Sequence, residues 1–117
     1  MQRNGKLFLY EIKGSTLEIK LSGEIDHHSA VGVRSDIDEL IFSERPERTV
    51  LDLSAISFMD SSGLGLIMGR YSLMKELGGS LSLRAPTNAV MKILSLAGMD
   101  RVIAIEKTQK ENKNEEK

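Results

Sequence analysis

Residues 49–65 read TVLDLSAISFMDSSGLG, and the change of pattern within this stretch decides the expected fold. Its first five residues are mostly apolar, which is typical of a short strand inside a parallel sheet. Residues 54–60 have no clear period and predict a loop. Over residues 62–77 apolar side chains recur every three or four positions, which predicts a helix that ends at Gly78-Gly79. The other side of this helix, which carries Arg70, is expected to face solvent. The expected apolar face comprises Leu64, Ile67, Met68, Tyr71, Met74 and Leu77.

The segment before this stretch predicts a β-hairpin followed by a helix. Residues 7–12 and 17–21 alternate between apolar and polar on either side of a Gly14-Ser15 turn, as paired strands do. Residues 23–28 leave this alternation and predict a loop. Over residues 29–41 apolar side chains return every three or four positions, so an amphipathic helix is expected there.

The segment after it continues the alternation of strands and helices. It predicts a strand at 81–83, a helix between Pro86 and Gly98, and a last strand at 102–105. Strands that alternate with helices in this way indicate parallel crossovers and an α/β domain. Residues 107–117 contain no apolar residue, so we expect a charged, disordered tail after a folded domain of residues 1–106.

Composition excludes several classes of protein. The chain has 117 residues, 16 basic and 17 acidic side chains, and no cysteine. That length suits one domain, and the lack of cysteine excludes disulfides, thiolate zinc sites and cysteine nucleophiles. A formal charge of −1 argues against nucleic-acid binding. The longest uncharged stretch is nine residues, 61–69, against the roughly 18 that a membrane span needs. The N-terminus has no signal-peptide pattern, so a cytoplasmic location is expected.

Two predicted loops follow strands, at 23–28 and 54–62. Ligands and reactive groups of open α/β sheets gather beyond the carboxyl ends of the strands. If the two strands are parallel neighbours, Asp26 lies near Asp60 and Ser61.

Asp60 and Ser61 stand where a helix is expected to begin. Their simplest role is helix capping, which contributes about 1 kcal/mol for each capping residue. A nucleophilic serine is not expected, because the Gly-x-Ser-x-Gly motif has Met59 in its first glycine position and both histidines precede the serine. No catalytic residue is therefore predicted.

Glycines near this helix start raise the alternative of phosphate binding. Gly63, Gly65 and Gly69 are one residue out of step with the dinucleotide fingerprint, and no P-loop lysine follows. Close packing of another backbone against Gly65 and Gly69 is the expected explanation of their spacing. The alternative of a nucleotide-binding or nucleotide-hydrolysing domain stays open, although no cofactor is predicted.

A histidine pair, His27-His28, lies beside Glu24 and Asp26. Adjacent histidines rarely chelate one ion, and the sequence offers no third ligand at suitable spacing. No metal site is therefore expected.

Ser61 has a further property, because it is expected to be exposed at a helix N-terminus. The helix dipole and the free N–H groups favour an anion there, so the position can accept a phosphate without breaking the helix. A phosphate adds a charge of about −1.5 to −2 beside Asp60, which would repel an acidic partner surface.

Four sequence elements resemble those of anti-sigma factor antagonists in the STAS domain family. They are residues 58–65 (FMDSSGLG), 69–71 (GRY), 78–79 (GG) and 96–99 (LAGM). The resemblance runs in order from Leu7 to Ile105. Residues 23–28 (GEIDHH) favour the sporulation branch of this family over its general stress branch, although the same switch in a stress pathway remains an alternative.

The resemblance implies a small mixed, mostly parallel sheet with flanking helices, and a regulatory protein rather than an enzyme. It implies that the unphosphorylated form binds an anti-sigma factor, a serine kinase, and so releases the sigma factor. It further implies that the kinase phosphorylates Ser61 and that a serine phosphatase reverses this step. We expect the free protein to be a monomer. The partner-binding residues that the resemblance implies are Glu24, Asp26, Asp60, Ser62, Gly63 and Gly65.

Overall fold

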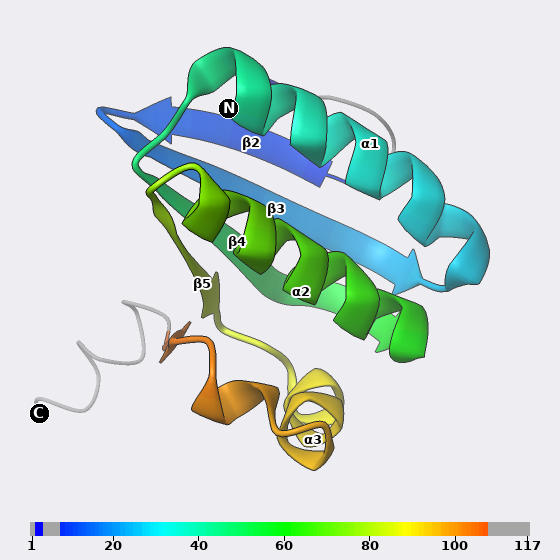
Figure 1. The fold of residues 1–117 in the computed structure, drawn as a ribbon. Helices are drawn as coiled ribbons and strands as arrows, with labels where there is room; N and C mark the ends of the chain where they lie inside the picture. Colours follow the sequence, from blue (N-terminus) through cyan, green and yellow to red (C-terminus); the bar gives the residue numbers. More distant parts are fainter. Residues whose placement is uncertain (1, 4–7, 108–117) are drawn as a thin grey trace, which may run out of the picture.

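A mixed β-sheet forms the centre of this computed structural model, which describes residues 2–3 and 8–107 (Figure 1). The described strands lie side by side in chain order. The first three pair antiparallel, and the pairs from β3 onward are parallel. The prediction of an α/β fold with a mixed, mostly parallel sheet is confirmed. The strands are β1 (Gln2–Arg3), β2 (Phe8–Lys13), β3 (Thr16–Ile25), β4 (Arg48–Met59), β5 (Ser80–Arg84) and β6 (Ile105–Glu106).

Two helices, α1 (His27–Glu44) and α2 (Ser61–Glu76), lie side by side over one face of the sheet (Figure 1). The third helix, α3 (Asn88–Leu96), lies apart from them and contacts β4, and a short 3₁₀ helix (Met99–Arg101) follows it. Alternate residues of the central strands point toward α1 and α2, because side chains alternate between the faces of a strand. The core therefore forms between this sheet face and the helices, with fully buried side chains that include Ile19, Leu51, Leu83, Ile37, Ile41, Ile67 and Met74.

The predicted hairpin is present. β2 and β3 pair antiparallel around Gly14-Ser15, with Lys13 opposite Thr16. Gly14 has φ +61°, a left-handed conformation that glycine adopts without the steric cost of a Cβ atom. The turn thus sets the register that places Leu17 and Ile12 on the same sheet face.

The two predicted loops at 23–28 and 54–60 are wrong, because residues 23–25 continue β3, residues 27–28 begin α1, and residues 54–59 continue β4. β3 runs on to Ile25 and β4 to Met59, and these ends pair with each other. The register shifts twice between them, and Gly23 has φ +81°. Such β-bulges insert extra residues and break the two-residue alternation by which a strand is recognised in sequence.

Two further predictions differ from the structure. The last strand begins at Ile105 and not at Val102, because Met99–Arg101 forms the 3₁₀ helix. The predicted face of α2 is rotated, since Met68 and Leu77 are exposed. The buried residues of α2 are Gly63, Leu66, Ile67, Arg70 and Met74. The predicted tail lies outside the described residues from 108 onward.

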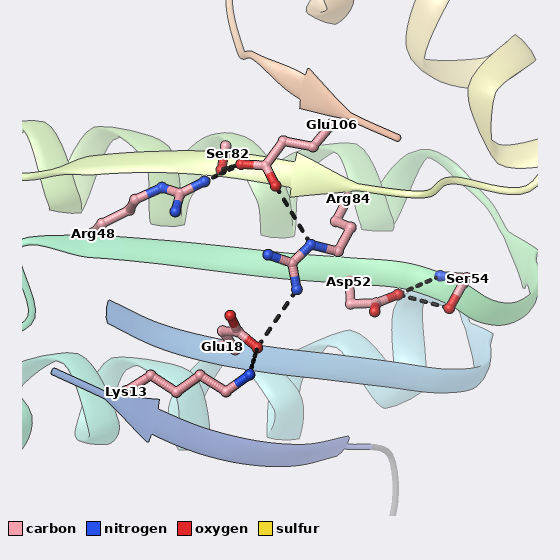
Figure 2. A network of polar contacts seen from close by, with 8 residues as sticks. All are labelled: Lys13, Glu18, Arg48, Asp52, Ser54, Ser82, Arg84 and Glu106. Atoms are coloured by element: carbon pink, nitrogen blue, oxygen red, sulfur yellow. Dashed lines mark hydrogen bonds and ion pairs between the residues drawn. The ribbon is translucent and has the colours of Figure 1, made fainter. Parts of the chain in front are cut away.

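The other face of the sheet carries a network of ion pairs (Figure 2). Glu18 Oε1 lies 3.6 Å from Lys13 Nζ and 3.5 Å from Arg84 Nη1, and Glu106 Oε1 lies 3.4 Å from Arg84 Nε. Glu106 also pairs with Arg48 and accepts a hydrogen bond from the Ser82 hydroxyl. Burial alone would lower the pKa of Arg84, but Glu18 and Glu106 raise it above its ordinary value.

This network covers an apolar residue of β4. Val50 is opposite Glu18 on one side and Ser82 on the other, so all three share the face of the network, and Val50 has no exposed surface. The described charges of this face are largely satisfied by one another. The polar side chains at the starts of α1 and α2 lie outside this network.

Candidate functional site

The carboxyl ends of β3 and β4 bring two helix starts together. Ile25 and Met59 are register partners, and the Asp60 N–H donates to the Ile25 carbonyl at 3.1 Å. Asp26 and Asp60 are the next residues, and each is the N-cap of the helix that follows. Figure 1 shows α1 and α2 beginning at the same end of the sheet. The structure thus has Asp26 beside the Asp60–Ser61 segment, as the parallel topology predicted.

The start of α1 is closed by a reciprocal cap. Asp26 Oδ1 accepts from the Ser29 N–H at 2.9 Å, and Ser29 Oγ accepts from the Asp26 N–H at 3.0 Å. The Ser29 hydroxyl also donates to the Glu24 carbonyl at 3.0 Å. The hydrogen bond from the Ser29 N–H holds the pKa of the Asp26 carboxyl below its ordinary value of 3.8. The side chains at this helix start are therefore occupied by the cap itself.

The cap at the start of α2 is a single hydrogen bond without the returning bond of a capping box, and we call it an open cap. Asp60 Oδ1 accepts from the Ser62 N–H at 2.8 Å, and no side chain returns a bond to the Asp60 N–H. Ser61, the first helical residue, is exposed, and Ser62 is half-buried. Within residues 2–3 and 8–107, neither serine hydroxyl has a hydrogen-bond partner. An exposed hydroxyl without a partner is accessible to another protein's active site.

Gly63 explains why this cap is open. A Cβ atom at Gly63 would lie 2.2 Å from Met59 Cγ and 2.5 Å from Met59 Sδ, so only glycine fits between helix and strand. In α1 the corresponding third residue is Ser29, which closes the capping box. The buried Met59 side chain thereby excludes such a serine from α2.

The packing predicted for Gly65 and Gly69 is wrong. A Cβ atom at either position would meet no atom within 4 Å, so neither glycine allows the close approach of another backbone. The close approach of a backbone occurs at Gly79 instead, where a Cβ atom would lie 2.7 Å from the Glu47 carbonyl oxygen. Gly65 is exposed on the side of α2 that faces α1, where it lines a hollow.

The remaining predicted residues lie around this pair of helix starts. Glu24 is exposed on β3 opposite Phe58, which is also exposed on β4. His27 and His28 form the exposed first turn of α1. The part of the chain that the structure describes holds no group of three or more His, Cys, Asp or Glu side chains suited to a metal ion.

Sequence reasoning missed an ion pair between the two helices. Arg70 is buried, not solvated as predicted, and its Nε lies 2.8 Å from Asp38 Oδ1 on α1. Burial lowers the pKa of Arg70, and the Asp38 charge opposes that change. The signal in the sequence is the spacing of Arg70, three residues after Ile67 and four before Met74, which puts it on the buried side of α2. This pair links α1 to α2.

Comparison with known proteins identifies the family. The family model described as STAS domain matches residues 8–112. The chain belongs to the STAS domain family. An "Anti-sigma F factor antagonist" of Paenibacillus polymyxa is 40% identical to this STAS domain over 89 residues, which cover 76% of each protein.

Solved structures agree with this assignment. The unphosphorylated anti-sigma factor antagonist SpoIIAA covers 92% of this STAS domain and 94% of its own chain, with 30% identity and a TM-score of 0.76. The phosphorylated form of the Bacillus cell fate determinant SpoIIAA covers 94% and 99%, with 29% identity and a TM-score of 0.69. Within its family, this STAS domain is of the anti-sigma factor antagonist type, as the sequence resemblance predicted. None of the helices in the described residues is both long and apolar enough to cross a membrane.

Proposed function

We propose that this STAS domain is the antagonist in a sporulation partner switch, with Ser61 as the phosphoacceptor. The unphosphorylated protein binds an anti-sigma factor that is a serine kinase, and the sigma factor is released. The kinase inactivates the antagonist by phosphorylating Ser61, and a serine phosphatase restores it. In this role the chain is the substrate of other enzymes in the cytoplasm and not an enzyme itself.

The state of Ser61 is the observation that supports this proposal. Ser61 is exposed, its hydroxyl has no hydrogen-bond partner among the described residues, and it occupies the first position of α2. A phosphate at that position gains from the positive end of the helix dipole. The relatives described above supply the class of partner, because one is named as an anti-sigma F factor antagonist and another is a phosphorylated form.

Phosphorylation is proposed to act locally, through charge and bulk, and not by reshaping the domain. The modification would move the formal charge of the chain from −1 to about −3, at the start of α2, where Asp60 is the N-cap and Asp26 caps the neighbouring helix. Partner contacts are assigned to the residues around that point. They are Glu24, Asp26, Asp60, Ser62, Gly63 and Gly65.

Phosphosite mapping tests this proposal. The protein is incubated with ATP and candidate anti-sigma factor kinases, and the phosphopeptides are identified by mass spectrometry. We expect one phosphate on Ser61, none in Ser61→Ala, and normal modification in the control Ser72→Ala, at an exposed serine later in α2. Modification of a different residue, or of Ser61→Ala, would refute the assignment.

Two alternatives are separated by simple measurements. The same switch in a general stress pathway differs only in partner, so binding to the kinases of both pathways decides between them. Nucleotide binding predicts tight, stoichiometric binding in titrations of the isolated protein. It has weak support, because Met59 fills the space beside Gly63 at the helix start.

A further inference from the structure

A groove lies between α1 and α2, directly beside Ser62. It is a hollow of about 250 Å³. The lack of a side chain at Gly65 keeps it open, because a Cβ atom there would project into empty space. Residues lining it include Ala30, Val31 and Arg34 from α1, and Ser62, Gly65 and Leu66 from α2.

One wall of this groove is apolar and accessible. Val31 exposes 54% of its surface on α1, and Leu66 on α2 is buried beneath the groove. An aliphatic side chain of a bound segment would cover Val31 and remove apolar surface from water.

The groove also carries a positive charge that has no counterpart. Arg34 is exposed, and no carboxylate among the described residues lies within ion-pair distance of it. The carboxylate four residues along α1, Asp38, is already paired with Arg70 at 2.8 Å. Arg34 lies close enough to Arg70 for its charge to lower the pKa of that guanidinium. Asp38 is therefore taken up by Arg70, and the charge of Arg34 has no counter-ion among the described residues.

We propose that the α1–α2 groove binds an acidic side chain of the anti-sigma factor, flanked by aliphatic residues, with Arg34 as its ion-pair partner. This inference rests on the proposed function. A guanidinium and a carboxylate form paired, charge-assisted hydrogen bonds, so Arg34 gives the site selectivity for an acidic segment. Val31 receives the aliphatic neighbours of that acidic residue.

The position of the groove links it to the switch. Ser62 lines the groove and Ser61 precedes it, so a phosphate on Ser61 places negative charge at the edge of the binding surface. The acidic segment that Arg34 attracts is the segment that this phosphate repels. Attraction at Arg34 and repulsion at Ser61 thus act on one element of the partner.

Charge changes at Val31 test the proposal without altering the core. Calorimetry measures binding to the purified anti-sigma factor kinase of the same organism, with a non-hydrolysable ATP analogue so that Ser61 stays unmodified. We expect Val31→Glu to bind about 10-fold more weakly and Val31→Lys at least as tightly as the unchanged protein. Equal weakening by both variants would overturn the proposal, because it would indicate loss of apolar contact alone.

Substitutions of Arg34 provide a second test in the same binding measurement. We expect Arg34→Glu to weaken binding by about 10- to 100-fold and Arg34→Gln by less, with an unchanged melting temperature. The matched control is Arg101→Glu, at an exposed arginine of the 3₁₀ helix, which should bind within about twofold of the unchanged protein. Unchanged affinity of Arg34→Glu would overturn the groove proposal while leaving the proposed function intact. Failure of the unchanged protein to bind the kinase would overturn both.

Discussion

The starts of α1 and α2 lie side by side, follow neighbouring strands and are both capped by an aspartate. They differ in their serine hydroxyls, because one is hydrogen-bonded and the other is not. At α1 the Ser29 hydroxyl donates to one backbone group and accepts from another. At α2 the Ser61 hydroxyl is exposed and has no hydrogen-bond partner among the described residues. The same local chemistry thus yields a closed cap in one helix and an open cap in the other.

The two caps differ at the third residue of each helix. In α1 that residue is Ser29, which completes the capping box, whereas in α2 it is Gly63, packed against Met59. Serine at a helix start is therefore not enough to predict a modification site. Its position matters, because the third residue of α1 is held by the capping box whereas the first residue of α2 is exposed.

A negative charge at Ser61, at the open cap of α2, should have the largest effect, a loss of binding to the partner. We expect Ser61→Asp to weaken binding to the anti-sigma factor kinase by about 100-fold or more, since the negative charge faces the partner. Ser61→Ala should remain competent to bind and should be active without a phosphatase. The control is Ser72→Asp at an exposed position later in α2, which should bind normally. Equal binding of Ser61→Asp and the unmodified protein would contradict electrostatic exclusion.

A side chain added at Gly63, against Met59, should have the next largest effect, a loss of stability. Gly63→Ala should lower the free energy of unfolding by about 1–3 kcal/mol, because its Cβ overlaps Met59. Gly65→Ala, the matched control in open space, should be neutral or stabilising by up to about 1 kcal/mol. Urea denaturation measures both variants. A Gly63→Ala protein as stable as the Gly65→Ala protein would remove the explanation of the open cap.

The two serines should differ in their contribution to stability. Ser29→Ala should lower the free energy of unfolding by about 0.5–1.5 kcal/mol, because it removes the reciprocal bond of the capping box. Ser61→Ala should change that free energy by less than about 0.5 kcal/mol, because its hydroxyl makes no such bond. Equal losses in chemical denaturation would mean that the two caps do not differ.

The smallest expected effect is that of acid on the melting temperature, through the capping carboxylate Asp26 of α1. The folded-state pKa of Asp26 is lowered from 3.8 by the Ser29 N–H, so its stabilising contribution is present above pH 3.8 and is lost as the pH falls through the lowered pKa. Asp26→Asn keeps a capping oxygen but does not titrate. Melting temperatures recorded between about pH 5 and about pH 2 should therefore fall less steeply for Asp26→Asn. Identical pH profiles would show that Asp26 is not perturbed.

Much of the fold could be predicted from the sequence, because most of its signals are local. The hairpin around Gly14-Ser15 and the alternation of strands and helices depend on period and turn chemistry. The ends of β3 and β4 were missed because bulges at their pairing break that period. The approach of Asp26 to Asp60 needed only parallel topology, which periodicity could supply.

Contacts between helices could not be predicted in this way. Arg70 is polar, and only its partner Asp38 on α1 makes its burial tolerable. The groove beside Ser62 depends on the spacing of two helices that are separated in sequence by β4. The packing of Met59 against Gly63 could not be predicted either, because it depends on how the end of β4 meets the start of α2.

Binding of the phosphorylated protein tests the central claim most directly. Calorimetry compares the unmodified protein with protein that carries one phosphate on Ser61, each titrated with the anti-sigma factor kinase under identical conditions. The account predicts stoichiometric binding of the unmodified form and affinity at least about 100-fold weaker for the phosphorylated form. Equal affinity of the two forms would contradict it.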